Sequence, residues 1–159
     1  MLDVNLIQIS PIGIQDLSRV MVNEKAAYFI PWSQSVFEDS ITGSNECWMI
    51  EYHGLLCGHA VVSNILDEAH LLNICISPEF SRKGLGRVLL QYLISKAVER
   101  KANVFFLEVR ASNKSAINLY FSEGFNEVGL RPNYYPREKK GGREDALLMT
   151  LELSVDQYV

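Results

Sequence analysis

Residues 82–87, Arg-Lys-Gly-Leu-Gly-Arg, bring three cations and two glycines together in one short segment. They follow an apolar, strand-like run at residues 71–76 and open a strongly periodic helix. The glycines let the backbone approach a ligand closely, and the start of a helix leaves N–H groups without intrahelical acceptors. These donors, the positive end of the helix dipole and the flanking cations favour a bound anion, typically a phosphate. The segment therefore predicts an anion-binding turn.

This turn does not fit the two common nucleotide-binding patterns. A dinucleotide-binding fold places its glycines after the first strand of a βαβ repeat, whereas several strand-like segments precede residues 82–87. The Gly-Lys-Ser/Thr of a P-loop is missing as well. A pyrophosphate-bearing cofactor of another kind fits the sequence better.

A second candidate is Glu108, in a run of apolar residues that predicts a strand over Val104–Val109. Such a continuously apolar strand is expected in the middle of a covered sheet. A carboxylate is costly to bury there without purpose, which favours a functional role. A structural role, in which Glu108 ends the strand or pairs with Arg110, is the alternative from these residues alone.

The surrounding segments predict a mixed α/β fold. Helices and strands are separated by their hydrophobic periodicity and by glycine or proline breaks. Before the turn we expect a strand over Val4–Ile9, a helix over Gly13–Phe29, a short helix capped by Ser33, a hairpin of Trp48–Tyr52 and Leu55–Ile65 around His53-Gly54, and a strand over Ala69–Ile76. After it we expect a helix over Gly84–Lys101, the strand with Glu108, a helix that starts at Ser112 or Asn113 and ends at Gly124, and closing strands over Phe125–Leu130 and Ala146–Leu153 that flank a polar loop, Arg131–Asp145.

Length and composition exclude several classes of protein. With 159 residues, of which 48% are hydrophobic and 21% charged, the chain fits one soluble globular domain over residues 1–159. Its formal net charge of −4 argues against a nucleic-acid binder that relies on bulk positive charge. The start of the chain lacks the features of a signal peptide, and no apolar stretch reaches membrane-spanning length. We expect a cytoplasmic protein without direct contacts to nucleic acid or membrane.

Taken together, these motifs resemble the GNAT superfamily of acetyl-CoA-dependent N-acetyltransferases over nearly the whole chain, Val4–Leu153. The acyl-CoA signature of that superfamily, Gln/Arg-x-x-Gly-x-Gly/Ala, corresponds to Ser81–Gly86, with Ser81 in place of the usual Gln or Arg. Within the superfamily the chain resembles the bacterial ribosomal-protein-alanine N-acetyltransferases, the RimI group. The segments that carry this likeness are Pro31-Trp32-Ser33, Leu107–Asn113, Leu119-Tyr120, Glu123-Gly124-Phe125, Asn133–Pro136 and Gly142–Ala146.

The resemblance implies a fold, a cofactor and a set of site residues. The fold would be a mixed, mostly antiparallel sheet with splayed central strands and flanking helices, and the cosubstrate would be acetyl-CoA, without a metal. The cofactor would contact the backbone of Ile74, Cys75 and Ile76, the turn formed by Arg82, Lys83, Gly84, Leu85, Gly86 and Arg87, and Asn113 at the start of the next helix. Glu108 would be the general base and Tyr120 the general acid. The acceptor would be the N-terminal alanine of the eighteenth small-subunit ribosomal protein.

Several of these residues also have plain structural interpretations. From periodicity alone Tyr120 is better explained as a core aromatic residue, and Asn113 serves equally well as a helix-start residue. Tyr134 and Tyr135 fit strand aromatics about as well as a peptide-contact surface. Cys75 is better interpreted as a small buried hydrophobe than as an acyl acceptor. The three histidines, His53, His59 and His70, lack the spacing of a metal site, and the three cysteines lack that of a disulfide framework.

The proposed chemistry favours an N-terminal amine over lysine. At pH 7 an α-amino group with a pKa of about 7.8 is roughly 15% neutral, whereas a lysine with a pKa of about 10.4 is about 0.04% neutral. The difference corresponds to about 3.5 kcal/mol of extra deprotonation cost for lysine. A single carboxylate, whose pKa burial would raise, therefore suits the α-amine better. The alternatives are a broader N-terminal or lysine acetyltransferase, a metabolite acetyltransferase and a non-catalytic acetyl-CoA-binding module.

Overall fold

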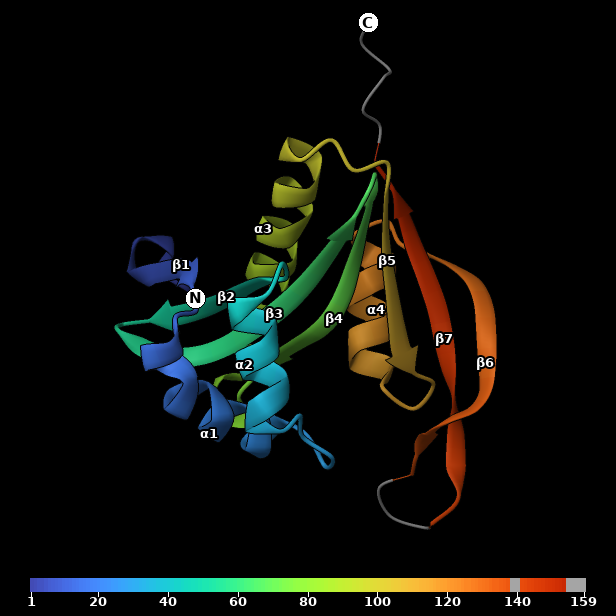
Figure 1. The fold of residues 1–159 in the computed structure, drawn as a ribbon, viewed down its shortest axis with the longest axis horizontal. Helices are drawn as coiled ribbons and strands as arrows, with labels where there is room; N and C mark the ends of the chain where they lie inside the picture. The colour runs from blue at the N-terminus through green and yellow to red at the C-terminus, as the bar shows by residue number, and fades with distance from the viewer. Residues whose placement is uncertain (138–140, 154–159) are drawn as a thin grey trace, which may run out of the picture. The chain divides into compact units, whose positions relative to one another are not determined.

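The computed structural model describes residues 1–137 and 141–153. By its internal contacts the chain packs as two compact units (Figure 1). Unit 1 comprises Met1–Asn64 and Leu72–Leu93, and unit 2 comprises Ile65–Leu71 and the chain from Ile94 onward. Strand β4 (Glu68–Ile76) and helix α3 (Leu85–Glu99) each run from one unit into the other. Hydrogen bonding connects the seven strands in the order β1-β2-β3-β4-β5-β7-β6.

Unit 1 contains the predicted antiparallel strands. They are β1 (Ile7–Pro11), β2 (Glu46–Tyr52) and β3 (Leu55–Ile65), and β2 pairs antiparallel with both of the others. His53 and Gly54 form the predicted two-residue hairpin turn, with φ angles of 54° and 76°. Positive φ at both central positions matches the twist of the flanking strands.

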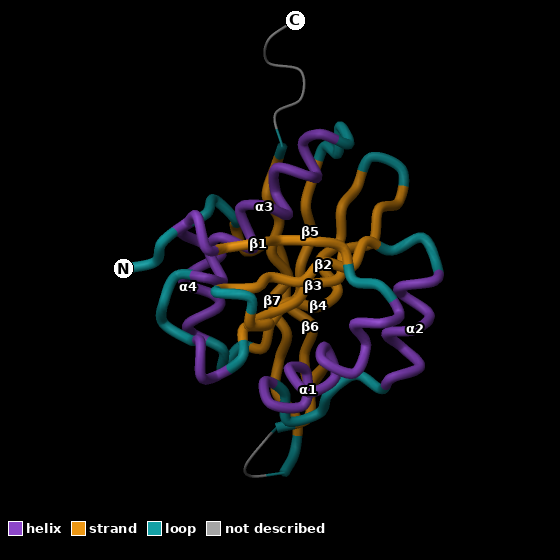
Figure 2. Tube along the Cα trace, turned by 90° about the vertical axis from the view of Figure 1, so that its left-hand side faces the viewer, coloured by secondary structure: helices purple, strands orange, loops and turns teal. Residues whose placement is uncertain are grey.

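Two helices of unit 1, α1 (Leu17–Ala27) and α2 (Gln34–Thr42), are neighbours in space (Figure 2). The hydroxyl of Ser33 accepts a hydrogen bond from the Val36 N–H at 3.3 Å, as expected for the cap of α2. The buried residues of this core come from both helices, from β2 and β3 and from the residue after β1; they are Ile12, Leu17, Val20, Met21, Phe37, Cys47, Met49 and Val61.

The start of the chain differs from the prediction. Val4–Leu6 is a 3₁₀-helix rather than a strand, and β1 begins only at Ile7. The side chain of Asp3 accepts a hydrogen bond from the Asn5 N–H and thereby caps the 3₁₀ turn. An extended backbone cannot form this local hydrogen bond, which therefore favours the turn. A second 3₁₀ turn, Ile14–Asp16, likewise precedes α1, which is therefore shorter than predicted.

Unit 2 consists of the end of α3, the first part of β4 and four further elements. These are β5 (Val104–Arg110), α4 (Lys114–Ser122), β6 (Asn126–Pro136) and β7 (Arg143–Glu152). Strand β7 lies between β5 and β6 and is antiparallel to both. Strands β4 and β5 are parallel, and their register covers Glu68–Leu71 with Val104–Leu107. The predicted mixed, mostly antiparallel sheet with flanking helices is confirmed.

Two predictions for unit 2 were wrong. Strand β5 was expected to be covered throughout, but its burial alternates, with Phe105, Leu107 and Val109 buried and the residues between them half-buried. Arg131–Asp145 was predicted as a loop, whereas β6 continues to Pro136 and β7 begins at Arg143. The proline at 132 is accommodated because the register of β6 and β7 shifts between Arg131 and Tyr135, which forms a bulge.

Candidate active site

In unit 1, the glycine-rich turn connects a short 3₁₀ segment, Pro78–Phe80, to the start of α3 at Leu85. Arg82 and Gly84 have positive φ angles of 61° and 89°, whereas that of Lys83 between them is not positive. Alternation of this kind points successive backbone N–H groups into a concavity that binds anions. The first hydrogen bond of the helix joins the Val88 N–H to the Gly84 carbonyl at 3.2 Å.

The same turn presents its charges to solvent. Arg82, Lys83 and Arg87 are exposed, and the N–H groups of the first helical residues, Leu85, Gly86 and Arg87, have no intrahelical acceptor. The hydroxyl of Ser81 donates to the Pro78 carbonyl at 2.8 Å, so this residue stabilises the preceding turn. Backbone and charge therefore both suit an anionic ligand.

The end of β4 offers backbone groups of two orientations. The Ser77 N–H donates to the Cys57 carbonyl of β3 at 2.8 Å, and the Cys75 carbonyl lies against Gly58 of β3. Because backbone groups alternate along a strand, those of Ile74 and Ile76 point to the other side. On that side the Ile74 carbonyl accepts a hydrogen bond from the Tyr28 hydroxyl. A carbonyl oxygen has two lone pairs and retains capacity for another donor.

In unit 2, Glu108 lies on β5 opposite Leu148 of β7. Its side chain is 31% exposed, and its Oε1 accepts a hydrogen bond from Nε of Arg131 at 3.0 Å. The carboxylate is thus half-buried, not buried as expected, and its ion-pair partner is Arg131 rather than Arg110. Arg131 comes from β6 and reaches across β7, where the small residue Ala146 occupies the paired position.

The bulge of β6 places two tyrosines beside this carboxylate. The Asn133 N–H donates to Oδ1 of Asp145 at 2.9 Å, and Asn133 has a positive φ of 51°. Arg143 donates from Nε to the Asn133 carbonyl at 2.9 Å and from Nη2 to the Tyr134 carbonyl at 2.7 Å. The bulge is therefore held by side chains of β7, and it sets the position of Tyr134 and Tyr135.

Both tyrosine rings have a cation on one face. The guanidinium of Arg110 lies 4.6 Å from the centroid of Tyr135, and that of Arg131 lies 5.5 Å from the centroid of Tyr134. The two rings meet edge to face at 4.9 Å. Burial and the negative charge of Glu108 raise the pKa of Tyr135 to about 12. This cluster gives unit 2 an aromatic, charged surface that includes one carboxylate.

Tyr120 is a buried residue of α4 whose ring lies 5.8 Å from that of Phe125. Burial, with a smaller contribution from Tyr135, raises the pKa of its phenol above the ordinary value. The core packing predicted from periodicity is present, and the phenol remains a proton donor over a wide pH range. Asn113 caps α4, since its Oδ1 accepts from the Ala116 N–H at 3.2 Å.

Sequence reasoning missed the partners of these residues. Arg131 lay in a predicted loop, and its contact with Glu108 depends on the register of three strands. A second omission is the buried side-chain cluster of Glu24, His59 and Cys75 in unit 1, whose members come from one helix and two strands.

Along residues 1–137 and 141–153, no helix is long and apolar enough to cross a membrane.

Comparison with known proteins establishes the family. The sequence profile of the acetyltransferase (GNAT) family matches residues 17–125. The chain belongs to this family. The matched segment includes the glycine-rich turn, Glu108 and Tyr120, so the resemblance predicted from the motifs is confirmed at the level of the family.

Relatives of similar length indicate which kind of acetyltransferase the chain is similar to. The [ribosomal protein bS18]-alanine N-acetyltransferase of Escherichia coli K12 is 40% identical over 147 residues, which are 92% of this chain and 98% of that protein. The enzyme of the same name from Haemophilus influenzae is 38% identical over 145 residues, 91% of this chain and 98% of that protein. The crystal structure of the ribosomal-protein-S18-alanine N-acetyltransferase from Escherichia coli superposes with a TM-score of 0.89, at 39% identity, over 96% of this chain and 97% of that chain. The chain is therefore an acetyltransferase of the type represented by these proteins.

Proposed function

We propose that this protein transfers the acetyl group of acetyl-CoA to the N-terminal α-amine of an alanine, that of ribosomal protein bS18. The observation that carries the proposal is the 40% identity to an enzyme of this name over nearly the full length of both chains. The transfer is proposed to be a direct attack of the amine on the thioester within one ternary complex. A single domain over residues 1–159 would act in the cytoplasm, without direct contacts to nucleic acid or membrane.

Acetyl-CoA is proposed to bind through the glycine-rich turn and the end of β4. The pyrophosphate would bind the backbone and cations of the turn, which its alternating φ angles and exposed Arg82 and Lys83 support. The backbone groups of Ile74 and Ile76 are the ones available to pair with the pantetheine arm, because those of Cys75 face β3. Asn113 would add a contact from its side-chain amide, whose oxygen already caps α4.

In the proposed mechanism Glu108 removes a proton from the α-ammonium group, directly or through a water molecule. The Glu108 side chain is 31% exposed, so an α-amine that arrives from solvent can reach its carboxylate. The reaction also needs a proton donor for the departing thiolate, and the protonated phenol of Tyr120 supplies one. Tyr134 and Tyr135 would contact the peptide next to its N-terminus. None of these steps requires a metal ion at the reacting atoms.

Two peptides test this proposal. One begins with a free alanine and contains an internal lysine, and the other is identical but blocked at its N-terminus. After incubation with acetyl-CoA, mass spectrometry locates the acetyl group. We expect acetylation only at the free α-amine. Acetylation of lysine in both peptides would contradict the proposal and indicate the broader enzyme. Binding of acetyl-CoA without transfer to either peptide would contradict it in favour of another acceptor or a binding module.

The role of the turn is tested by Gly84→Val. At a φ of 89° an L-residue is strained by about 1–2 kcal/mol, so the turn would leave its anion-binding conformation. A loss of about 1.4 kcal/mol in cofactor binding corresponds to a KM for acetyl-CoA about tenfold higher. Steric clash is not the cause, because the nearest atom to an added Cβ is Cδ1 of Leu2 at 3.6 Å.

Gly54→Val is the matched control. Gly54 also has a positive φ, 76°, and an added Cβ there would meet nothing within 4 Å. It lies in the turn between β2 and β3, away from the glycine-rich segment in sequence. We expect both variants to lower the Tm, but only Gly84→Val to raise the KM for acetyl-CoA. An unchanged KM for acetyl-CoA in steady-state kinetics of Gly84→Val would show that the turn does not bind the cofactor.

A further inference from the structure

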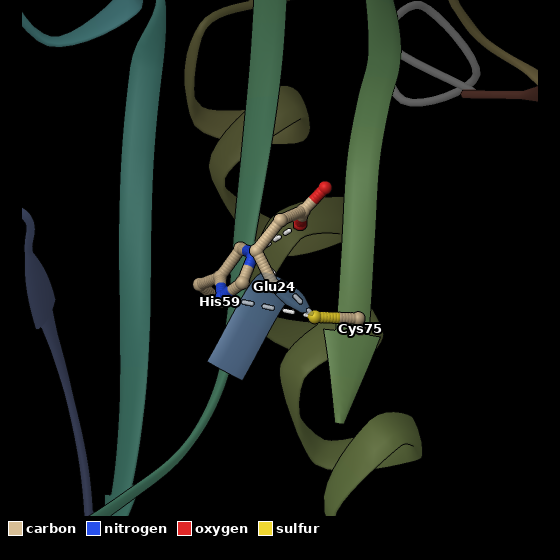
Figure 3. Close-up of side chains that lie close together, drawn as sticks. All are labelled: Glu24, His59 and Cys75. Carbon is tan, nitrogen blue, oxygen red and sulfur yellow. Dashed lines mark hydrogen bonds and ion pairs between the residues drawn. The ribbon is translucent and has the colours of Figure 1, made fainter. Parts of the chain in front are cut away.

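Three potential metal ligands converge in the core of unit 1 (Figure 3). Glu24 comes from α1, His59 from β3 and Cys75 from β4, and their exposed fractions are 1%, 0% and 9%. Nε2 of His59 lies 2.9 Å from Oε1 of Glu24 and 3.4 Å from Sγ of Cys75. One carboxylate oxygen, one imidazole nitrogen and one thiol sulfur all lie within 4.8 Å of one another. Within the described residues, this is the group whose donor atoms could hold an ion.

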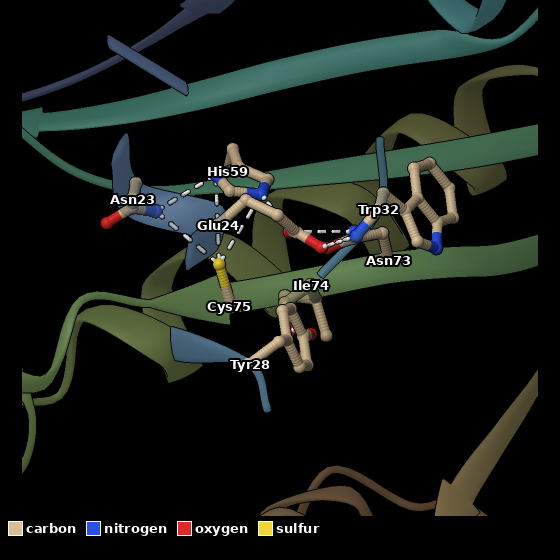
Figure 4. A network of polar contacts seen from close by, with 8 residues as sticks. All are labelled: Asn23, Glu24, Tyr28, Trp32, His59, Asn73, Ile74 and Cys75. Carbon is tan, nitrogen blue, oxygen red and sulfur yellow. Dashed lines mark hydrogen bonds and ion pairs between the residues drawn. The ribbon is translucent and has the colours of Figure 1, made fainter. Parts of the chain in front are cut away.

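Two buried asparagines border the cluster and leave it incompletely satisfied (Figure 4). Nδ2 of Asn23 lies 2.9 Å from Nδ1 of His59, and Nδ2 of Asn73 donates to Oε1 of Glu24 at 3.0 Å. Both asparagines are at least nine-tenths buried, and the Oδ1 atoms of both have no hydrogen-bond partner. A buried polar atom without a partner costs about 1–3 kcal/mol, which makes two of them beside one cluster unusual.

The charges of the three side chains also suit a divalent cation. The Glu24 carboxylate lies 2.9 Å from Nε2 of His59 through its Oε1 and accepts a hydrogen bond from the Trp32 N–H at 2.9 Å through its Oε2. A divalent cation bound by one carboxylate, one thiolate and one neutral imidazole would make the site electrically neutral.

Two of the three ligand separations are close to those around a small tetrahedral ion. With Zn–N and Zn–O bonds of about 2.0–2.1 Å and a Zn–S bond of about 2.3 Å, ligand atoms around zinc are about 3.3–3.6 Å apart. The separation of 3.4 Å between Sγ of Cys75 and Nε2 of His59 already has this value. The separation of 2.9 Å between Nε2 and Oε1 of Glu24 would open by about 0.4 Å. Sulfur, imidazole and carboxylate together favour Zn²⁺ over the hard cations Mg²⁺ and Ca²⁺.

We propose that Glu24, His59 and Cys75 bind a structural Zn²⁺ ion, with Oδ1 of Asn73 as the fourth ligand. On binding, the Cys75 thiol loses its proton to solvent and its sulfur bonds to the metal. The proton on Nε2 of His59 moves to Nδ1, so that Nε2 is free to bind the ion. Rotation of the two amides then turns Oδ1 of Asn73 to the ion and Oδ1 of Asn23 to the Nδ1–H of His59. These contacts replace those that Nδ2 of Asn73 makes with Glu24 and that Nδ2 of Asn23 makes with His59 and Cys75.

The consequence of this site would be structural. It would join α1, β3 and β4 within unit 1, and β4 is the strand that carries Ile74 and Ile76. Because its ligands are buried, the ion would enter as the chain folds and would exchange slowly with chelators. The inference concerns metal binding and stability, and it does not depend on the proposed acetyl transfer.

Metal content tests the inference directly. The full chain is refolded with Zn²⁺, dialysed against a chelator and measured by elemental mass spectrometry. We expect about one zinc per chain, and at least tenfold less zinc in Cys75→Ala. Cys57→Ala is the matched control, since Cys57 is also a buried cysteine, on β3, but its Sγ donates to the Ile50 carbonyl at 3.2 Å. This control should keep its zinc.

Refolding with Co²⁺ in place of Zn²⁺ supplies a second readout. Coordination by the Cys75 thiolate should give a sulfur-to-cobalt charge-transfer band in the near ultraviolet, present in Cys57→Ala and absent in Cys75→Ala. Circular dichroism is used to check that both variants are folded. If Cys75→Ala does not fold, His59→Phe takes its place. Substoichiometric metal in the folded wild-type chain, or equal metal content in Cys75→Ala and wild type, would overturn the proposal.

Discussion

Replacing Glu108 by glutamine is expected to lower kcat by about 100-fold at neutral pH, the lower end of the range for general acid–base catalysis. The substitution keeps the size of the side chain and leaves an amide oxygen that still accepts from Nε of Arg131, 3.0 Å from the carboxylate in the wild type. The local structure of β5 should therefore survive. The amide has no capacity to remove a proton, and the KM values should change little.

The pH dependence of this variant is as informative as its rate. Without the carboxylate the α-amine must lose its proton to solvent, and its neutral fraction rises about tenfold per pH unit below a pKa of about 7.8. The activity of Glu108→Gln should therefore rise with pH, and its optimum should lie above that of the wild type. Initial rates with the free-alanine peptide, measured from about pH 6 to about pH 9, report both effects.

A matched control separates proton transfer from general loss of surface charge. Glu127 is an exposed carboxylate on β6 in the same unit, and Glu127→Gln removes the same charge. We expect wild-type kinetics for it. If Glu108→Gln shows wild-type rates over the whole pH range, Glu108 is not the general base.

Features of the site that depend on neighbouring residues in the sequence were predictable. The glycine-rich turn and the His53-Gly54 hairpin were both identified from residue type and order, because positive φ angles are set by the turn residues themselves. The cap of α2 by Ser33 was likewise local. The family resemblance rests on the same kind of signal, since short motifs retain their spacing.

Features that depend on strand register were not predictable. The pairing of Glu108 with Arg131 spans 23 residues and requires β7 to lie between the two strands. The bulge of β6 was hidden because Pro132 normally argues against a strand, and only the side chains of Arg143 and Asp145 reveal what stabilises it. Glu108 was expected to be buried because its neighbours are apolar, but alternation along β5 turns it to the half-buried side.

The buried cluster of unit 1 illustrates the same limit. Glu24, His59 and Cys75 are separated by 35 and 16 residues, and no metal-binding motif has such spacing. In the sequence His59 had no assigned role and Cys75 was interpreted as a small hydrophobe. Their proximity follows from the pairing of β3 with β4 and the packing of α1, which are tertiary features.

Tyr120→Phe is expected to lower kcat by about 10- to 100-fold, with little effect on stability. The substitution keeps the aromatic ring that packs 5.8 Å from Phe125 and removes only the hydroxyl. Transfer of a proton from a phenol with a pKa of about 10 to a thiolate with a pKa of about 8.5 is already uphill by roughly 2 kcal/mol. Since burial raises the phenol pKa further, complete transfer becomes less favourable. Tyr120 should therefore act by donating a hydrogen bond to the developing thiolate.

The raised pKa of Tyr120 also fixes the expected pH profile. A phenol whose pKa lies above its ordinary value keeps its proton at pH values where a free tyrosine begins to ionise, so the donor form persists. The wild-type kcat should therefore show no decline from this group up to about pH 10. Tyr52→Phe is the control, because Tyr52 is a phenol of unit 1 whose hydroxyl accepts a hydrogen bond from the Asp3 N–H at 3.2 Å. A kcat for Tyr120→Phe equal to that of Tyr52→Phe would leave Tyr120 with its packing role alone.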